Sequence, residues 1–171
     1  MAERGHEAEG ERRSGMKHYL LIKGSGRSRT GAPLNSSEAA DALLWSRMWP
    51  LWEHTRCRKM IEPGDRVAIY CSGGAAAVIG TARVTGLEPW TRQHLLAYPL
   101  LLEGVPHIVL RLDDIRRFDD PLKVQPILTR LTWFARKAPT KKWGVHFMGG
   151  VRFVNEADFE TFTGKTKGAA A

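Results

Sequence analysis

The chain has 171 residues, 43% of them hydrophobic, and a formal net charge of +8. This length suits a single domain with its own core, and no apolar run approaches the roughly 18 residues of a membrane-spanning helix, so we expect no membrane partner. The charged N-terminus does not resemble a signal peptide, and two cysteines without metal-type spacing fit a reducing compartment. We therefore predict a cytoplasmic protein that holds neither a metal nor another cofactor.

Residues 1–15 contain almost no apolar side chains, which predicts a disordered tail, and 164–171 predict a second, flexible tail. Between the two tails, 16–163 form the predicted domain. It begins with the apolar stretch KHYLLIK, residues 17–23, which predicts a buried strand. A loop rich in Gly, Ser and Arg comes next, so the first strand leads into a flexible, cationic segment.

A helix is predicted over the sequence EAADALLWSRMW. Ser36 or Ser37 can cap its first turn, and Pro50 requires the helix to end near Trp49. Trp45 lies beside a leucine of this helix, and we expect its ring in the core.

The segment 63–86 carries the signals of a β-hairpin. The sequence Pro-Gly-Asp at 63–65 predicts a turn, and RVAIYC at 66–71 predicts a strand. Gly73 and Gly74 allow the chain to reverse before a further strand, AAVIGTARVTG.

Shorter elements follow: a helical turn over 88–98, a strand over 107–112, a helix over 121–131 and strands over 143–147 and 151–154. Asn155 then caps a last helix, EADFETF, with Asp158 as its capping-box partner. Short strands separated by helices favour an α+β fold built on a small mixed β-barrel of about five to six strands, flanked by short helices.

The cationic residues cluster in the C-terminal third of the chain. Between Asp120 and Glu156 there is no acid but seven cations, interleaved with Trp133, Phe134, Trp143 and Phe147. The cations are Lys123, Arg130, Arg136, Lys137, Lys141, Lys142 and Arg152. This pattern is typical of a surface that binds a polyanion whose bases stack on rings, although a solvated basic face over core aromatics would look the same.

Three common cofactor motifs are absent from the sequence. The stretch GSGRSR follows a strand, but Arg29 stands where a dinucleotide fingerprint needs its third glycine. The tripeptide GKT near the C-terminus has Phe159 where a phosphate loop needs its first glycine. His54 and Cys57 are spaced for one helical turn, but two ligands are too few for zinc.

Two groups of residues could support an enzyme. Asp113, Asp114, Asp119 and Asp120 form two acidic pairs that could hold magnesium in a nuclease, but flanked by Arg116 and Arg117 they are more simply a salt-bridged loop. Cys71 could act as a nucleophile if His18 or His146 reached it, whereas a free cysteine at a strand end is usually a buried, inert thiol.

The order of these features resembles the EVE domain of the PUA-like superfamily over residues 17–162. The stretches that carry the resemblance are HYLLIKGS, LWSRMWPLWE, MIEPGDRVAIYCSGGAAAVIGTARV, DDPLKV and WGVHFMGGVRFVNEADFETF. The third is the most specific, because a PGD turn, a strand ending in Tyr-x-Ser, a glycine turn and GTARV follow one another in it.

The resemblance implies a pseudo-barrel whose deep cleft accepts a base of a nucleic acid, in particular a modified cytosine in DNA, without catalysis. A plain RNA-binding module, or an enzyme acting on a nucleobase or phosphodiester, is the alternative. The positions expected to contact the base are Tyr19, Lys23, Gly24, Ser25, Trp52, Tyr70, Cys71, Ser72 and Trp143. The cations expected to contact phosphates are Arg27, Arg29, Lys141 and Lys142.

Two of these positions depart from the family pattern. Tyr19 stands where a tryptophan is common, and Cys71 where a histidine is common, so a stacking surface is kept while one polar contact is weakened. Physically, a strand that ends in Tyr70 before two glycines lets the main chain approach a flat ligand closely. The prediction requires Trp52 and Tyr70 to face the same opening.

Overall fold

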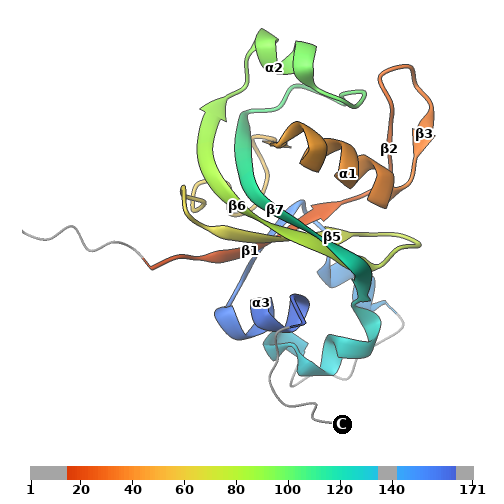
Figure 1. The fold of residues 1–171 in the computed structure, drawn as a ribbon, viewed down its shortest axis with the longest axis vertical. Helices are drawn as coiled ribbons and strands as arrows, with labels where there is room; N and C mark the ends of the chain where they lie inside the picture. The colour runs from red at the N-terminus through yellow and green to blue at the C-terminus, as the bar shows by residue number, and fades with distance from the viewer. Residues whose placement is uncertain (1–14, 135–141, 165–171) are drawn as a thin grey trace, which may run out of the picture.

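The computed structural model describes residues 15–134 and 142–164. Its main feature is a six-stranded sheet that curls into a half-barrel, with the strand order β4-β7-β6-β5-β1-β8 (Figure 1). The strands are β1 (His18–Lys23), β4 (Met48–Leu51), β5 (Arg66–Cys71), β6 (Ala77–Pro89), β7 (Ile108–Lys123) and β8 (Val151–Val154). β1 pairs parallel with β5, and the other neighbours pair antiparallel.

Short helices and one small hairpin surround this sheet. The hairpin consists of β2 (Gly26–Arg27) and β3 (Pro33–Leu34). The α-helices are α1 (Ser36–Ser46), α2 (Arg92–Ala97) and α3 (Glu156–Phe162), and the 3-10 helices are Gln125–Arg130, Thr132–Phe134 and Trp143–His146. The arrangement is α+β, as predicted. Among the described residues, no helix combines the length and the apolar character needed to cross a membrane.

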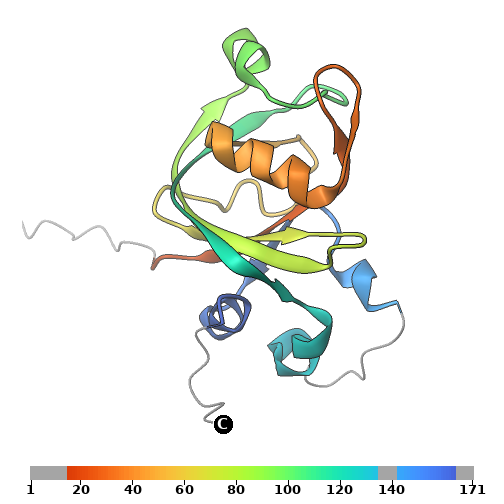
Figure 2. The ribbon, with the colours of Figure 1, turned by 45° about the vertical axis from the view of Figure 1, so that its right-hand side comes forward.

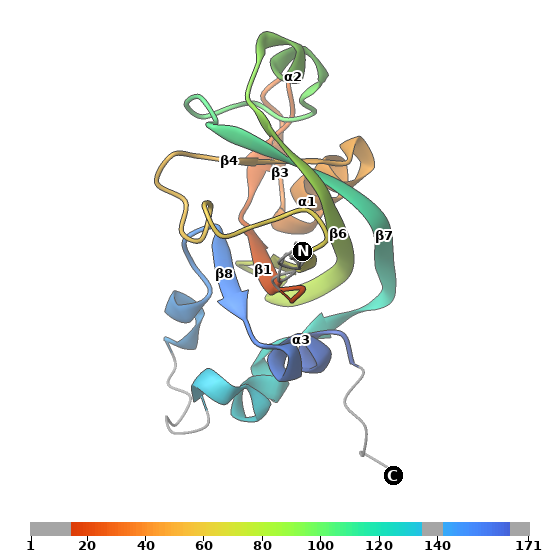
Figure 3. The same ribbon diagram turned by 90° about the vertical axis from the view of Figure 1, so that its left-hand side faces the viewer.

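The two long strands β6 and β7 form a bent ribbon that closes the half-barrel (Figure 3). Their pairing shifts register at three places, near Val78, Thr81 and Val84. Such bulges bend and twist a strand pair. At Gly80 the carbonyl oxygen of Arg116 occupies the space that a Cβ would need, so only glycine fits this crossing.

The sheet separates two apolar cores because side chains alternate along each strand. Tyr19 and Leu21 of β1 face the barrel interior, which α1 closes. Leu20 faces the opposite side, together with Tyr70 of β5. There α3 and the 3-10 helices cover the sheet; Figure 1 shows α1 and α3 on opposite sides of it.

The ends of α1 differ from the prediction. Asn35 is the N-cap, and it forms a capping box with Glu38, while Arg47 ends the helix in the left-handed conformation. The segment that follows, with Pro50 in it, is strand β4 and not the last turn of a helix. Proline is tolerated there because β4 is an edge strand.

Three further elements were predicted wrongly. β7 continues to Lys123, so the region 113–120 is strand and not loop, and only Gln125–Arg130 is helical, as a 3-10 helix. The region 143–147, which contains Gly144, forms a 3-10 helix and not a strand. Asn155 is the N-cap of α3, as predicted, and its side chain accepts from the Asp158 backbone N–H (2.8 Å). The Asp158 carboxylate, however, accepts hydrogen bonds from the Thr132 backbone N–H (2.8 Å) and hydroxyl (2.6 Å), and this differs from the predicted capping box.

Candidate functional site

Several hollows meet where β1 ends, around Gly24 and Ser25. Two adjoining hollows of about 100 and 280 Å³ share Lys23, Trp52 and Tyr98, and we call them together the inner cleft. A hollow of about 640 Å³, the outer hollow, lies on the other side of Gly24. Its lining residues include Tyr70, Ser72, Trp143, Phe147 and Gly150. A further hollow of about 630 Å³ is lined by glycines and serines that include Ser25, Ser37 and Ser72.

Trp52 forms one wall of the inner cleft. Its indole Nε1 donates a hydrogen bond to the Glu103 carbonyl oxygen (3.2 Å), and its backbone N–H donates to the Thr55 hydroxyl (3.0 Å). The side chain nevertheless remains 36% exposed. A ring that is fixed at one end and open on a face is suited to stack a flat ligand.

Tyr98 lines both parts of the inner cleft, and the sequence did not indicate it. It is the C-cap residue of α2, and its buried ring meets Trp90 edge-on at 5.7 Å between centroids. Burial raises the pKa of Tyr98 to about 12, so its hydroxyl remains protonated and able to donate. Long-range hydrogen bonds between this part of the chain and the β2–β3 hairpin bring Tyr98 to the cleft that Trp52 lines.

Lys23 supplies a positive charge inside the inner cleft. Burial lowers the pKa of its ammonium group, and the Glu103 carboxylate, which lines the same cleft, opposes that effect. Within the described residues the Lys23 ammonium donates no hydrogen bond to the protein. A partly desolvated cation without a partner favours a ligand that accepts hydrogen bonds.

The outer hollow holds a different subset of the predicted residues. The Tyr70 ring is buried against Phe147, with centroids 4.9 Å apart, and burial raises the pKa of Tyr70 to about 12. Trp143, in the 3-10 helix, meets Phe147 edge-on at 5.6 Å. Trp52 and Tyr70 therefore do not face one opening, because the shared wall of Ile22, Gly24 and Gly150 separates the two hollows.

Ser72 connects the end of β5 to β1 and α1. Its backbone N–H and its hydroxyl both donate to the Lys23 carbonyl oxygen (2.9 and 3.3 Å), and its own carbonyl oxygen accepts from the Ser36 hydroxyl (2.7 Å). A Cβ at Gly24 would lie 3.6 Å from the Ser72 hydroxyl. These contacts fix the floor of the site.

Tyr19 and Cys71, which were expected to contact the base, are fully buried in the barrel core and line none of the hollows described above. Burial raises the pKa of Tyr19 to about 12 and that of Cys71 to about 11. Strand alternation explains their position: Cys71 follows Tyr70 directly and must face the opposite side of the sheet. Neither side chain offers a contact surface in this structure.

Of the predicted phosphate-binding cations, Arg27 is the one that the described structure places in the lining of the inner cleft. Arg27 lines it and donates to the Gly31 carbonyl oxygen (3.3 Å). Arg29 donates to the Leu96 carbonyl oxygen (3.0 Å). Lys142 is exposed next to Trp143, and Lys141 lies outside the described residues.

The residues considered for catalysis are engaged elsewhere. Asp113 pairs with Arg47 (3.1 Å), and Asp114 pairs with Arg116 (3.2 Å) and Arg66 (3.6 Å). No cluster of three potential metal ligands occurs in the part of the chain that the structure describes.

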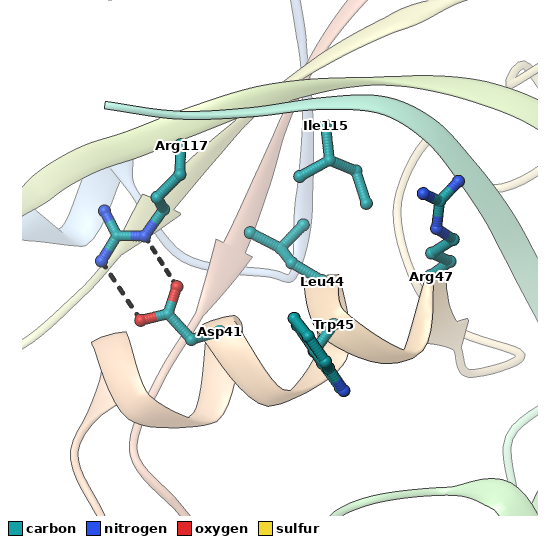
Figure 4. Close-up of a pocket in the computed structure, with 6 residues that line it drawn as sticks. All are labelled: Asp41, Leu44, Trp45, Arg47, Ile115 and Arg117. Atoms are coloured by element: carbon teal, nitrogen blue, oxygen red, sulfur yellow. Dashed lines mark hydrogen bonds and ion pairs between the residues drawn. The ribbon is translucent and has the colours of Figure 1, made fainter. Parts of the chain in front are cut away.

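A separate hollow of about 510 Å³ lies between α1 and β7 (Figure 4). Trp45 borders it and is 91% exposed, so its predicted place in the core was wrong. The buried residues of α1 are Ser36, Ala39, Ala40, Leu43 and Leu44. Arg117 holds Asp41 with two contacts of 2.7 and 3.2 Å beside it. None of the predicted site residues lines this hollow.

No protein-family model and no curated protein matches the sequence. Solved structures do match the fold. The human THYN1 protein in complex with 5-methylcytosine containing DNA aligns with a TM-score of 0.57 and 12% identity, over 89% of this chain and 99% of that chain. The chain has an α+β PUA-like fold.

Two other solved structures align similarly. A mutant ASCH protein from Zymomonas mobilis gives a TM-score of 0.56 at 12% identity, over 88% of this chain and 97% of that chain. The DUF55 domain of human thymocyte nuclear protein 1 gives 0.54 at 10% identity, over 88% and 99%. The predicted PUA-like fold is thus confirmed, whereas membership of the PUA-like superfamily and of its EVE group stays a prediction.

Proposed function

We propose that this protein is a nucleic-acid-binding module that holds a base, in particular a modified cytosine, in the inner cleft and catalyses no reaction. The observation that carries the proposal is the combination in one cleft of the exposed Trp52, the Tyr98 ring and a Lys23 ammonium that donates no hydrogen bond within the described residues. A fold neighbour solved with 5-methylcytosine containing DNA supports the class of ligand.

The energetics favour an aromatic cleft of this kind. A base that leaves a duplex loses a few kcal/mol of stacking and pairing, and stacking on an aromatic side chain restores about 1–3 kcal/mol. Trp52 can provide this stacking because its ring is held by Glu103 and is open on one side. The remaining stabilisation has to come from polar contacts.

Lys23 and Glu103 provide groups for such contacts. An ammonium group donates to the carbonyl oxygen or ring nitrogen of a base, and a carboxylate accepts from the exocyclic amino group of cytosine. One donor and one acceptor in the same cleft match the edge of cytosine better than that of thymine, which has no amino group. Arg27, at the margin of the cleft, is placed for a phosphate contact.

The proposal excludes catalysis by the residues first considered for it. The Cys71 thiol is buried and its pKa is raised to about 11, so little thiolate forms near neutral pH. Asp113 is paired with Arg47, and Asp114 is paired with Arg116 and Arg66. RNA remains the alternative ligand, because the cleft contacts proposed here involve the base and not the sugar.

A fluorescence titration tests the function. We expect tighter binding of methylcytosine-containing DNA than of unmodified DNA or of RNA, and this preference should persist at two salt concentrations, whereas phosphate contacts weaken with salt. Trp52→Ala should weaken binding of the modified DNA by roughly 5- to 150-fold, the equivalent of the stacking energy.

Trp45→Ala is the matched control, because it removes an exposed tryptophan outside the cleft and should leave binding unchanged. Equal losses in both variants, or equal losses on all ligands, would contradict the assignment of the cleft. Conversion of the oligonucleotide during incubation would show that the protein is an enzyme.

A further inference from the structure

One exposed leucine lines the inner cleft, and a second lies in α2, which is hydrogen-bonded to the hairpin that borders the cleft. Leu101 lines the cleft with its side chain 49% exposed, and Leu96, in α2, is 63% exposed. Arg27 and Arg29 come from the facing hairpin of β2 and β3. We call these four residues the leucine–arginine rim.

Backbone contacts hold the rim together. The Leu101 N–H donates to the Arg27 carbonyl oxygen (2.9 Å), Arg29 donates to the Leu96 carbonyl oxygen (3.0 Å), and a single bridge pairs Ser28 with the residue before Leu101. Figure 2 shows α2 and the β2–β3 hairpin at the same end of the molecule. The backbone of both leucines is thus anchored to the hairpin, while much of their surface is exposed to solvent.

The rim is cationic as well as apolar. Arg27 and Arg29 donate to carbonyl oxygens, and within the described part of the chain neither guanidinium forms an ion pair. Their charge is therefore available to a polyanion. An apolar surface flanked by free cations complements the stacked bases and phosphates of a duplex better than it complements a protein with a neutral apolar patch.

We propose that the leucine–arginine rim is a wedge that opens duplex DNA beside the inner cleft. Leu96 and Leu101 enter the base step from which the base is extruded, and Arg27 and Arg29 bind the flanking phosphates. Proteins that kink DNA insert apolar side chains between base steps in this way, at a cost of a few kcal/mol per unstacked step. The inference rests on the proposed function, since it supplies the means by which a paired base reaches the cleft.

Single-stranded and duplex DNA distinguish the wedge from the cleft. In the double variant L96A/L101A, we expect affinity for a matched duplex with one 5-methylcytosine to fall about tenfold or more. Affinity for the same strand unpaired should stay within about twofold, because no step has to be opened. A mismatch opposite the methylcytosine should restore much of the lost affinity.

A second measurement reports the opening directly. When 2-aminopurine is placed next to the methylcytosine in a duplex, the fluorescence of 2-aminopurine should increase on binding of the wild-type protein. It should not increase on binding of the double variant. Val105→Ala is the matched control, because Val105 is 78% exposed on the same loop but lines no part of the cleft.

The possible failures are distinct. If L96A/L101A loses affinity equally for single-stranded and duplex DNA, or loses none for the duplex, the wedge is refuted. The cleft assignment still holds in that case if affinity for the single strand depends on Trp52. If no Trp52-dependent binding occurs on either form, the proposed function and the wedge both fail. The leucines are exposed, so an unchanged thermal midpoint of the double variant is expected and confirms that it is folded.

Discussion

Replacing Lys23 by methionine should stabilise the fold and weaken nucleic-acid binding at the same time. The Lys23 ammonium is half-buried, and in the described structure no hydrogen bond compensates its desolvation; a thioether of similar length removes that cost. We expect the free energy of unfolding to rise by about 0.5–2 kcal/mol, the gain that a single stabilising substitution commonly gives. The loss of one charge-assisted hydrogen bond should reduce the affinity for DNA by roughly 10- to 150-fold, or about 1.5–3 kcal/mol.

The pH dependence of stability and of binding provides a second test of the role of Lys23. Burial lowers the pKa of Lys23 below its ordinary value of 10.5, so the unfolded chain binds more protons than the folded chain between the lowered pKa and 10.5. Across that window the stability of the wild type should rise with pH relative to Lys23→Met. Binding should show the opposite trend, because the ammonium that contacts the ligand is lost as pH rises through the lowered pKa.

Urea unfolding and a DNA titration measure both effects. Lys59→Met is the control, since Lys59 is exposed and lines none of the hollows described above. A lower midpoint in urea for Lys23→Met, at an unchanged slope, would mean that the ammonium stabilises the fold. That result would refute the argument that Lys23 is kept for a ligand.

Three further outcomes follow from the contacts described. Asp158→Ala should lower the free energy of unfolding, measured in a thermal or urea transition, by about 1–3 kcal/mol, because two donors of Thr132 lose their acceptor. The control Glu160→Ala, at an exposed position of the same helix, should change it by less than about 0.5 kcal/mol. Gly80→Ala should destabilise the protein strongly or prevent its expression in soluble form, since the Arg116 carbonyl oxygen occupies the place of its Cβ. In a thiol-labelling assay on native protein at mildly alkaline pH, Cys57 should react well before Cys71, which is fully buried with a pKa raised to about 11; simultaneous labelling would contradict the described core.

Local patterns were sufficient to predict the β5–β6 hairpin and strand β1. Both consist of apolar runs that lie between clear turn signals. The two strands of the hairpin are also close in sequence, and β1 pairs with one of them, β5. Strand β4 could not be predicted in the same way. A short apolar run with Pro50 inside it resembles the end of a helix, and only its pairing with β7, about sixty residues away in sequence, makes it a strand.

Part of the site was accessible to sequence reasoning and part was not. Tyr70 and Cys71 are neighbours in a predicted strand, so the alternation of side chains already implied that they face opposite sides. Tyr98 and Glu103 reach the cleft because the loop after α2 is hydrogen-bonded to the β2–β3 hairpin. Those long-range contacts have no local signature, and the two residues were missed for that reason.

The position of the site follows from the topology of the sheet. β1 and β5 are parallel neighbours, so their carboxyl ends lie side by side at the same end of the strands. A tight turn cannot connect two parallel strands. The chain leaves this end in two directions, through Gly24 into the β2–β3 hairpin and through Ser72 into the β5–β6 turn. Because the two segments diverge, hollows form on both sides of Gly24. In open α/β sheets, too, ligands usually bind at the carboxyl ends of parallel strands. The inner cleft is the better candidate of the two for a base, because it contains the exposed indole of Trp52, whereas the Tyr70 ring in the outer hollow is already covered by Phe147.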